Sequence, residues 1–297
     1  MSMVDVSTRI QLKNILFTTD FSPASNAAVP YAAALAKRYG AKLHALHVRP
    51  PIVNPMTPPR SWKAAEEAAK IEAELQTREL VKSFAGLRPE ILIEEGDLWS
   101  NLAKAIEEKK IDLIVMGTRG RSGVGKFVLG SSAEEVFRRA ACPVLTVGPH
   151  SPAKAPLGSE FTHIVFATDF SPASAAAAPY VISLAQECQA YLTLLHVVAE
   201  PKAGELVDAP ELVRSLTQLL HNLVPSEAEL WCVPKFVIER GKVAETILSV
   251  AEQARADLIV LGVRQPSGFP GAATHLPIAI AHKIVSHATC PVLTVRA

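Results

Sequence analysis

The chain has 297 residues, of which 49% are hydrophobic and 20% are charged, with 30 basic and 29 acidic side chains and a net charge of +1. This length suggests two domains, the hydrophobic share excludes wholesale disorder, and the balanced charge gives no general attraction to nucleic acid or to an anionic membrane. The 4 cysteines have no close pair and no metal-ligand spacing. Because the N-terminus is polar and no apolar run approaches the ~18 residues of a membrane span, we expect a cytoplasmic protein.

The first half of the chain alternates short apolar runs with helical patterns. Strands are predicted at 15–17, 42–48, 91–94, 113–116 and 144–147, and helices at 27–38, 62–84, 98–109 and 132–139. Gly40 follows the first helix as a stop signal, and the proline-rich stretch 50–59 is predicted to be a loop. Apolar strands separated by helices indicate a parallel sheet covered on both faces, so the fold class is α/β.

The second half repeats the first. The segment Thr19–Ser25 recurs unchanged as Thr168–Ser174, and Cys142–Val147 recurs as Cys290–Val295. This period is far too long for a solenoid repeat, so the sequence indicates a duplicated domain.

A connector rich in proline and small polar residues, 149–160, separates the two copies. We therefore expect one domain at residues 1–150 and another at residues 151–297. In the second domain, four leucines are predicted to form the apolar face of the second helix: Leu212, Leu216, Leu219 and Leu223.

Ligands of open parallel sheets bind beyond the carboxyl ends of the strands, so the residues that follow each strand are the candidates for a site. The segment 117–132 follows the fourth strand, opens onto a helix, and holds five glycines and three serines. Glycines let backbone N–H groups approach a phosphate, and the helix N-terminus favours an anion. Arg119, Arg121 and Lys126 add positive charge there. This loop is the strongest site signal in the chain.

Part of this loop is similar to a P-loop. Residues 120–126 match the start of the G-x-x-x-x-G-K motif, but Phe127 stands where a serine or threonine would hold Mg²⁺. The loop also follows the fourth strand of its domain rather than the first. We therefore do not expect a P-loop.

The whole loop matches a different signature. Gly117, two residues, Gly120, nine residues and then Gly130-Ser131 resemble the nucleotide-binding signature of the universal stress protein family. The resemblance also includes the Thr-Asp end of the first strand, the His-Val of the second strand and the Cys-Pro-Val-Leu-Thr-Val last strand. It extends over both halves, so the chain resembles a tandem universal stress protein.

This resemblance implies two tandem open five-stranded parallel sheets with helices on both faces, a Rossmann-like fold of the adenine-nucleotide α-hydrolase-like kind. It further implies that ATP is bound, and we expect Mg²⁺ with it, without assigning residues to the metal. The residues carried over from the family are, for the adenosine, Thr19, Asp20, Val48, Met116 and Gly117, and, for the phosphates, Arg119, Gly120, Gly130, Ser131 and Ser132.

The second copy has lost this signature. Gly262 matches Gly117, but Gln265 stands in place of Gly120, and 278–280 replace the Gly-Ser-Ser at 130–132 with Ile-Ala-Ile. Branched aliphatic side chains offer an anion no hydrogen bonds, so we expect no ATP in the second domain and a structural role for Asp169. The last strands of the two domains, 144–147 and 292–295, are expected to pair the halves into a pseudo-dimer, and a further homodimer is left open.

Three functions remain open at this point. The first is an ATP-binding stress-response or regulatory protein, the second is a slow ATPase or other nucleotide-processing enzyme, and the third is a scaffold that binds no nucleotide. Asp20 fits both a ligand contact and a turn that begins the first helix. His47 and His196 are expected to be packed or hydrogen-bonded rather than ligands. Under the first function, Gly117→Val or Gly130→Val should remove the thermal stabilisation by ATP and leave the fold intact.

Overall fold

The computed structural model describes residues 10–50, 59–84, 86–118, 129–152, 161–199, 209–225, 232–264 and 275–296. In the first half the elements are β1 (Asn14–Thr18), α1 (Pro23–Asn26), α2 (Val29–Tyr39), β2 (Lys42–Arg49), α3 (Pro59–Ser83), β3 (Glu90–Glu95), α4 (Leu98–Lys109), β4 (Leu113–Gly117), α5 (Ser131–Arg139) and β5 (Val144–Val147). In the second half they are β6 (His163–Ala167), α6 (Pro172–Cys188), β7 (Tyr191–Val198), α7 (Ala209–His221), β8 (Lys235–Arg240), α8 (Val243–Gln253), β9 (Leu258–Val263), α9 (His275–His287) and β10 (Val292–Arg296).

The strands form one ten-stranded sheet in the order β3-β2-β1-β4-β5-β10-β9-β6-β7-β8. Within each half all neighbouring strands are parallel, so the predicted α/β class and the five-stranded parallel sheets are confirmed. The two sheets are continuous, because β5 and β10 pair antiparallel at the centre.

This central pair joins the halves where the sequence predicts. Leu145 lies opposite Leu293, and each strand also contributes a threonine to the pairing. The Thr146 hydroxyl donates to the Val292 carbonyl at 3.0 Å, and the Thr294 hydroxyl donates to the Val144 carbonyl at 3.3 Å. These reciprocal bonds give the interface an approximate two-fold symmetry.

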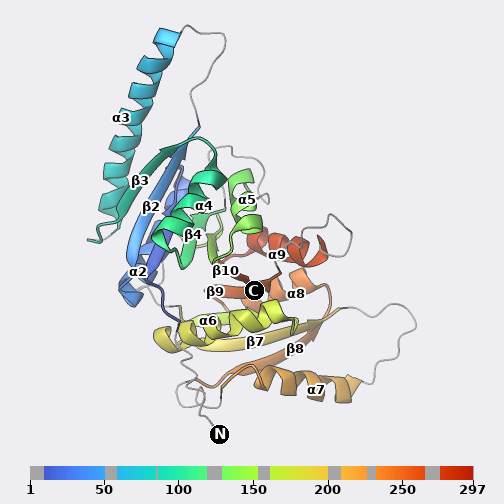
Figure 1. Cartoon of the computed structure of the whole chain (residues 1–297). Helices are drawn as coiled ribbons and strands as arrows, with labels where there is room; N and C mark the ends of the chain where they lie inside the picture. The colour runs from blue at the N-terminus through green and yellow to red at the C-terminus, as the bar shows by residue number, and fades with distance from the viewer. Residues whose placement is uncertain are drawn as a thin grey trace.

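Each face of the sheet carries one layer of helices, as Figure 1 shows. One hydrophobic cluster lies under α2, α3, α6 and α7, and the other lies under α4, α5, α8 and α9. Both clusters contain residues from both halves: Leu145 and Leu293 belong to the first, and Val144 and Val292 belong to the second. Alternating strand residues therefore extend both cores across the domain interface.

The segment Asp-Leu-Ile-Val occurs in both halves, at 112–115 and 257–260, and its aspartate has a structural role in each domain. Asp112 accepts hydrogen bonds from the backbone N–H groups of Lys13 and Asn14, where β1 begins. Asp257 accepts the equivalent bonds from Thr162 and His163 at the start of β6. Each carboxylate thus satisfies donors that the end of the ladder leaves open.

The structure differs from the predicted helices in two details. The helix predicted at 27–38 is present as α2, but it is preceded by a short helix that was not predicted, α1, in which Ser22 caps the N-terminus and a proline is tolerated in the first turn. In α7, Leu219 is exposed while Leu220 is fully buried. The apolar face therefore runs through Leu220, four residues beyond Leu216, and Leu219 lies beside it.

The other expectations for the first half agree with the structure to within a few residues. Gly40 ends α2 in the left-handed conformation, with φ of 61°. Residues 51–58, the interior of the predicted proline-rich loop, lie outside the described residues. Among the described helices, none is long and apolar enough to cross a membrane.

Candidate functional site

A cavity of about 320 Å³ lies in the first domain at the carboxyl ends of β1, β2 and β4. The chain passes from β1 to β2 on one side and reaches β4 on the other, so the cavity lies at the point where the strand order reverses. Its walls are formed by Thr18, Thr19, Asp20, Ser25, Leu46, Val48, Leu98, Met116, Gly117, Gly130, Ser131, Ser132 and Ala133.

Most of the predicted site residues meet at this cavity. The eight that line it are Thr19, Asp20, Val48, Met116, Gly117, Gly130, Ser131 and Ser132. Arg119 and Gly120 lie outside the described residues, as do Arg121 and Lys126 of the same loop and Gln265 of the second domain. Because no ligand is present, the role of each lining residue stays a prediction.

Sequence reasoning missed five lining residues, namely Thr18, Ser25, Leu46, Leu98 and Ala133. Ser25 belongs to the repeated Thr-Asp-Phe-Ser-Pro-Ala-Ser segment, so the repeat itself was a signal for it. Leu98 is the first residue of α4, which follows β3. Nothing in its local sequence distinguishes it from a core leucine.

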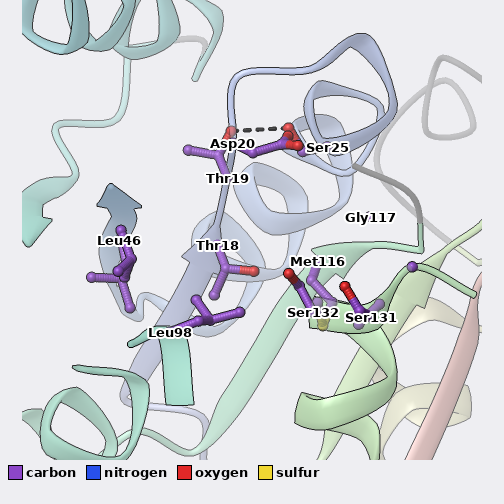
Figure 2. Close-up of a pocket in the computed structure, with 13 residues that line it drawn as sticks. Thr18, Thr19, Asp20, Ser25, Leu46, Leu98, Met116, Gly117, Ser131 and Ser132 are labelled. Atoms are coloured by element: carbon purple, nitrogen blue, oxygen red, sulfur yellow. Dashed lines mark hydrogen bonds between the residues drawn. The ribbon is translucent and has the colours of Figure 1, made fainter. Parts of the chain in front are cut away.

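The cavity has an apolar part and a polar part. Leu46, Val48, Leu98 and Met116 supply aliphatic and thioether surface. In Figure 2, Leu46 lies on one side of the space and Ser131 on the other, with Thr19 and Ser25 along a third edge. This arrangement of apolar walls and a few polar groups is typical of small-molecule sites.

The turn from β1 into α1 is fixed by its own side chains. Thr19 Oγ1 accepts from the N–H of Phe21 at 2.9 Å, and Asp20 Oδ1 accepts from the N–H of Ser22 at 3.0 Å. Ser22 then caps α1 by accepting from the N–H of Ser25. Phe21 adopts a left-handed conformation with φ of 62°, which bulky residues rarely adopt.

The polar edge of the cavity is tied to neighbouring elements. The hydroxyls of Thr19 and Ser25 are hydrogen-bonded at 3.0 Å, as the dashed line in Figure 2 marks. His47 donates from Nδ1 to the Thr19 carbonyl at 2.8 Å, and the centroid of its ring lies 4.3 Å from the centroid of the Phe21 ring. Asp20 therefore serves the turn, as one of its two expected roles requires, and lines the cavity as well.

Gly117 is required by packing. A Cβ on this residue would lie 2.5 Å from the carbonyl oxygen of Ala24 and 2.9 Å from the Cα of Ser25, both backbone atoms of α1. The same crowding occurs at Gly262, where a Cβ would lie 2.2 Å from the carbonyl oxygen of Ala173. The expectation that Gly117→Val leaves the fold intact is therefore wrong, since this glycine lets a helix approach the strand end in both domains.

The N-terminus of α5 faces the cavity. Gly130 is its N-cap, without a side-chain hydrogen bond to the helix, and the N–H of Gly130 donates to the Thr118 carbonyl at 2.9 Å. The first backbone N–H groups of a helix have no partners within the helix. Ser131, Ser132 and Ala133, the first residues of α5, line the cavity, so the positive end of the helix dipole lies beside it and favours an anion there.

The second domain keeps the turn after its first strand, but its last helix does not begin at the equivalent position. Phe170 has φ of 58°, Ser171 caps α6, and His196 Nδ1 donates to the Thr168 carbonyl, as in the first domain. However, α9 begins at His275, four residues before Ala279, which is the counterpart of Ser131. Backbone amides at 279 and 280 therefore lie inside the helix, where its own carbonyls accept them.

Asp169 is held by its turn. Its Oδ1 accepts from the Ser174 hydroxyl at 2.6 Å and from the Ser171 N–H at 3.0 Å. Burial raises the pKa of Asp169, but the bonds from Ser171 and Ser174 and the charge of Arg264 outweigh it and keep the pKa below its ordinary value. This network supports a structural role for Asp169.

Comparison with known proteins places this chain in a family. A universal stress protein of Methanocaldococcus jannaschii is 36% identical over 140 residues, which is 46% of this chain and 81% of that protein. A universal stress protein of Mycolicibacterium smegmatis is 27% identical over 300 residues, which is 95% of this chain and 96% of that protein. The crystal structure of a universal stress protein from Archaeoglobus fulgidus shares the fold, with a TM-score of 0.70 at 21% identity, over 97% of this chain and 99% of that chain.

The family model for the universal stress protein family matches the chain twice, at residues 11–148 and 160–296. Together the two matches span most of the sequence, one in each half of the ten-stranded sheet. The chain therefore belongs to the universal stress protein family, as a tandem member.

Proposed function

We propose that the protein is a stress-response or regulatory protein that binds an adenine nucleotide, ATP with Mg²⁺, in the cavity of its first domain. The observation that carries this proposal is the N-terminus of α5 in the wall of a cavity that also has an apolar part. A nucleotide needs this combination, because its base is flat and apolar and its phosphates are anionic.

The described residues fit such a ligand in three parts. The apolar walls at Val48 and Met116 suit the base, and the oxygens of Thr19 and Asp20 suit the ribose hydroxyls. The amides at the start of α5 suit the phosphates. A volume of about 320 Å³ lies at the lower end of the usual range for ligand pockets. Mg²⁺ commonly binds through phosphate oxygens, waters and one or two carboxylates, so it would arrive with the nucleotide.

The second domain serves to pair with the first. Its α9 begins too early to present free amides at the equivalent place, and Asp169 is engaged in its turn. Its strand β10 completes the sheet against β5. We therefore assign the nucleotide site to residues 1–150 and the pairing role to residues 151–297.

Binding is a better proposal than catalysis. Among the described lining residues Asp20 is the one side chain that could act as a general base, and it already accepts a hydrogen bond from the Ser22 N–H. A multiple-turnover phosphate-release assay tests this point. Robust ATP hydrolysis that Asp20→Ala abolishes would replace the binding proposal with an enzymatic one.

The proposed compartment is the cytoplasm. All four cysteines are free thiols, and burial raises the pKa of Cys142 to about 11 and that of Cys290 to about 12. Thiols that remain unpaired are usual in a reducing compartment. Because the thiolate is the reactive form and both pKa values are raised, mild oxidation should leave Cys142 and Cys290 unmodified in the folded protein.

The test of the proposed function is a substitution at the start of α5. Ser132→Asp places a negative charge where the helix dipole favours it, so α5 should fold as well as before, while phosphate is repelled. We expect this variant to weaken Mg-ATP binding by about tenfold or more and to lose ATP-dependent thermal stabilisation.

The matched control is Ala279→Asp, which adds the same charge at an exposed position of α9 in the second domain. This variant should keep the full melting shift with ATP. GTP and inorganic tripolyphosphate serve as probes beside ATP. If tripolyphosphate stabilises the wild-type protein as much as ATP does, the site is a general anion site and the adenine-nucleotide assignment is wrong.

A further inference from the structure

Arg296 reaches from the second domain to the far end of α5. It is the last residue of β10, and its Nη1 donates to the carbonyl oxygen of Arg138 at 2.6 Å. Its guanidinium carbon also lies 5.8 Å from the ring centroid of the buried Phe137. Arg138 and Arg139 are paired with Glu134 and Glu135 one turn earlier, so their charges are locally compensated.

The counterpart of Arg296 in the first domain is Gly148. The offset of 148 that relates Cys142 to Cys290 also relates these two positions. A Cβ on Gly148 would lie 3.5 Å from the carbonyl oxygen of Ala288, at the end of α9. Each last strand therefore runs to the C-terminal end of the other domain's last helix. The asymmetry is that α5, whose N-terminus lines the cavity, meets a guanidinium, while α9 meets a glycine.

The two ends of α5 contact different parts of the protein. Its nine residues span about 13 Å at the usual rise per residue. The first residues, from Ser131 to Ala133, line the cavity, and the last ones lie against Arg296. Between these two ends Val136 and Phe137 are buried, so the short helix packs as one rigid element.

The guanidinium stabilises the end of the helix that the cavity does not use. The last carbonyls of a helix have no partners within it, and a cation there interacts favourably with the helix dipole. Arg296 satisfies one such carbonyl from outside the domain. A contact that fixes one end of a short, rigid helix also restricts the other end, so less order must be gained when a ligand binds there.

We propose that Arg296 is a positioning residue through which the second domain sets the nucleotide affinity of the first. This inference rests on the proposed function, since it concerns the same cavity. Because coupling between two equilibria is reciprocal, nucleotide binding must in turn strengthen the contact of α5 with β10. The second domain thereby regulates nucleotide binding as well as pairing with the first domain.

The test compares full-length variants by calorimetric titration with Mg-ATP, well below the melting temperature of each. Arg296→Met keeps an apolar stem over Phe137 and removes the charge, and we expect binding about five- to tenfold weaker. Arg296→Lys retains a cationic donor and should restore most of the affinity. Arg214→Ala removes a charge from an exposed position on α7 and should bind as the wild type does.

A second measurement separates positioning from mere stability. In the wild type, Mg-ATP should slow amide hydrogen exchange at residues 137–140 as well as at 131–134. In Arg296→Met it should slow exchange at 131–134 alone. A folded Arg296→Met variant with wild-type affinity would overturn the positioning role and leave the proposed function standing. A wild-type protein that binds no Mg-ATP would overturn both.

Discussion

At the scale of single residues, the two copies use the same side chains for the same turn. Phe21 and Phe170 both have left-handed φ values, a conformation that costs on the order of 1–3 kcal/mol for a bulky residue. The preceding threonine hydroxyl accepts from each phenylalanine N–H, and the rings of His47 and His196 lie against them. The repeated Thr-Asp-Phe-Ser-Pro segment is therefore explained by folding before any ligand is considered.

Gly117, the last residue of β4, and Gly262, the last but one of β9, give the residue-scale prediction. Gly117→Ala and Gly262→Ala each force a Cβ into the backbone of the facing helix, so each should lower the free energy of unfolding by about 2 kcal/mol or more. The measurement is urea denaturation followed by circular dichroism. Gly148→Ala is the matched control, because its Cβ would meet its neighbours at ordinary contact distances.

If Gly117→Ala unfolded at the same urea concentration as the wild type, the close approach of α1 to β4 would be in error. A loss confined to Gly117→Ala would also be informative. It would mean that the crowding at Gly262 is relieved by movement of α6.

At the scale of elements, Glu90 connects three parts of the first domain. From β3 its carboxylate pairs with Lys42 on β2 and with Lys109 at the end of α4. His44, whose pKa burial lowers, lies 3.4 Å from the same carboxylate. The hydrogen bonds from Lys109 and Lys42 lower the pKa of Glu90 from 4.5 to about 2.

This lowered pKa predicts a loss of stability in acid. A carboxylate with a depressed pKa contributes stability that is full above its unfolded value and is lost as the pH falls from 4.5 towards about 2. Glu90→Gln should therefore reduce the dependence of the melting temperature on pH in this window. Glu79→Gln, which breaks an exposed pair with Lys82 on α3, should leave that dependence unchanged. Equal pH profiles for Glu90→Gln and the wild type would contradict the role of this carboxylate.

At the scale of the whole molecule, the sequence predicts the features that rest on the internal repeat or on a short continuous segment. Strands β4 and β5 and helix α4 follow from the alternation of apolar runs with helical patterns, and the central pair of β5 with β10 follows from the repeated last strand. The site loop was found from glycine spacing, and eight of the ten predicted site residues, four of them from this loop, line one cavity. These features are visible because each rests on a short segment or on an internal comparison.

The remainder depends on contacts between distant segments. Glycine spacing alone cannot distinguish Gly117, which leaves room for the backbone of a helix, from a glycine that leaves room for a phosphate. Leu98 enters the cavity from α4, and Arg296 reaches α5 across the interface, so neither has a local signal. Leu219 and Leu220 are neighbours on α7, so the packing of this helix against the rest of the domain, rather than the spacing of its leucines, decides that Leu220 is the buried one.

The central claim is that one domain binds the nucleotide and the other does not. The most direct measurement is a calorimetric titration of the nucleotide-stripped, full-length protein with Mg-ATP, read for stoichiometry as well as affinity. The structure predicts a single site per chain, because α5 presents free amides to a cavity and α9 begins too early to do so. Two sites per chain, or none, would contradict this division between the domains.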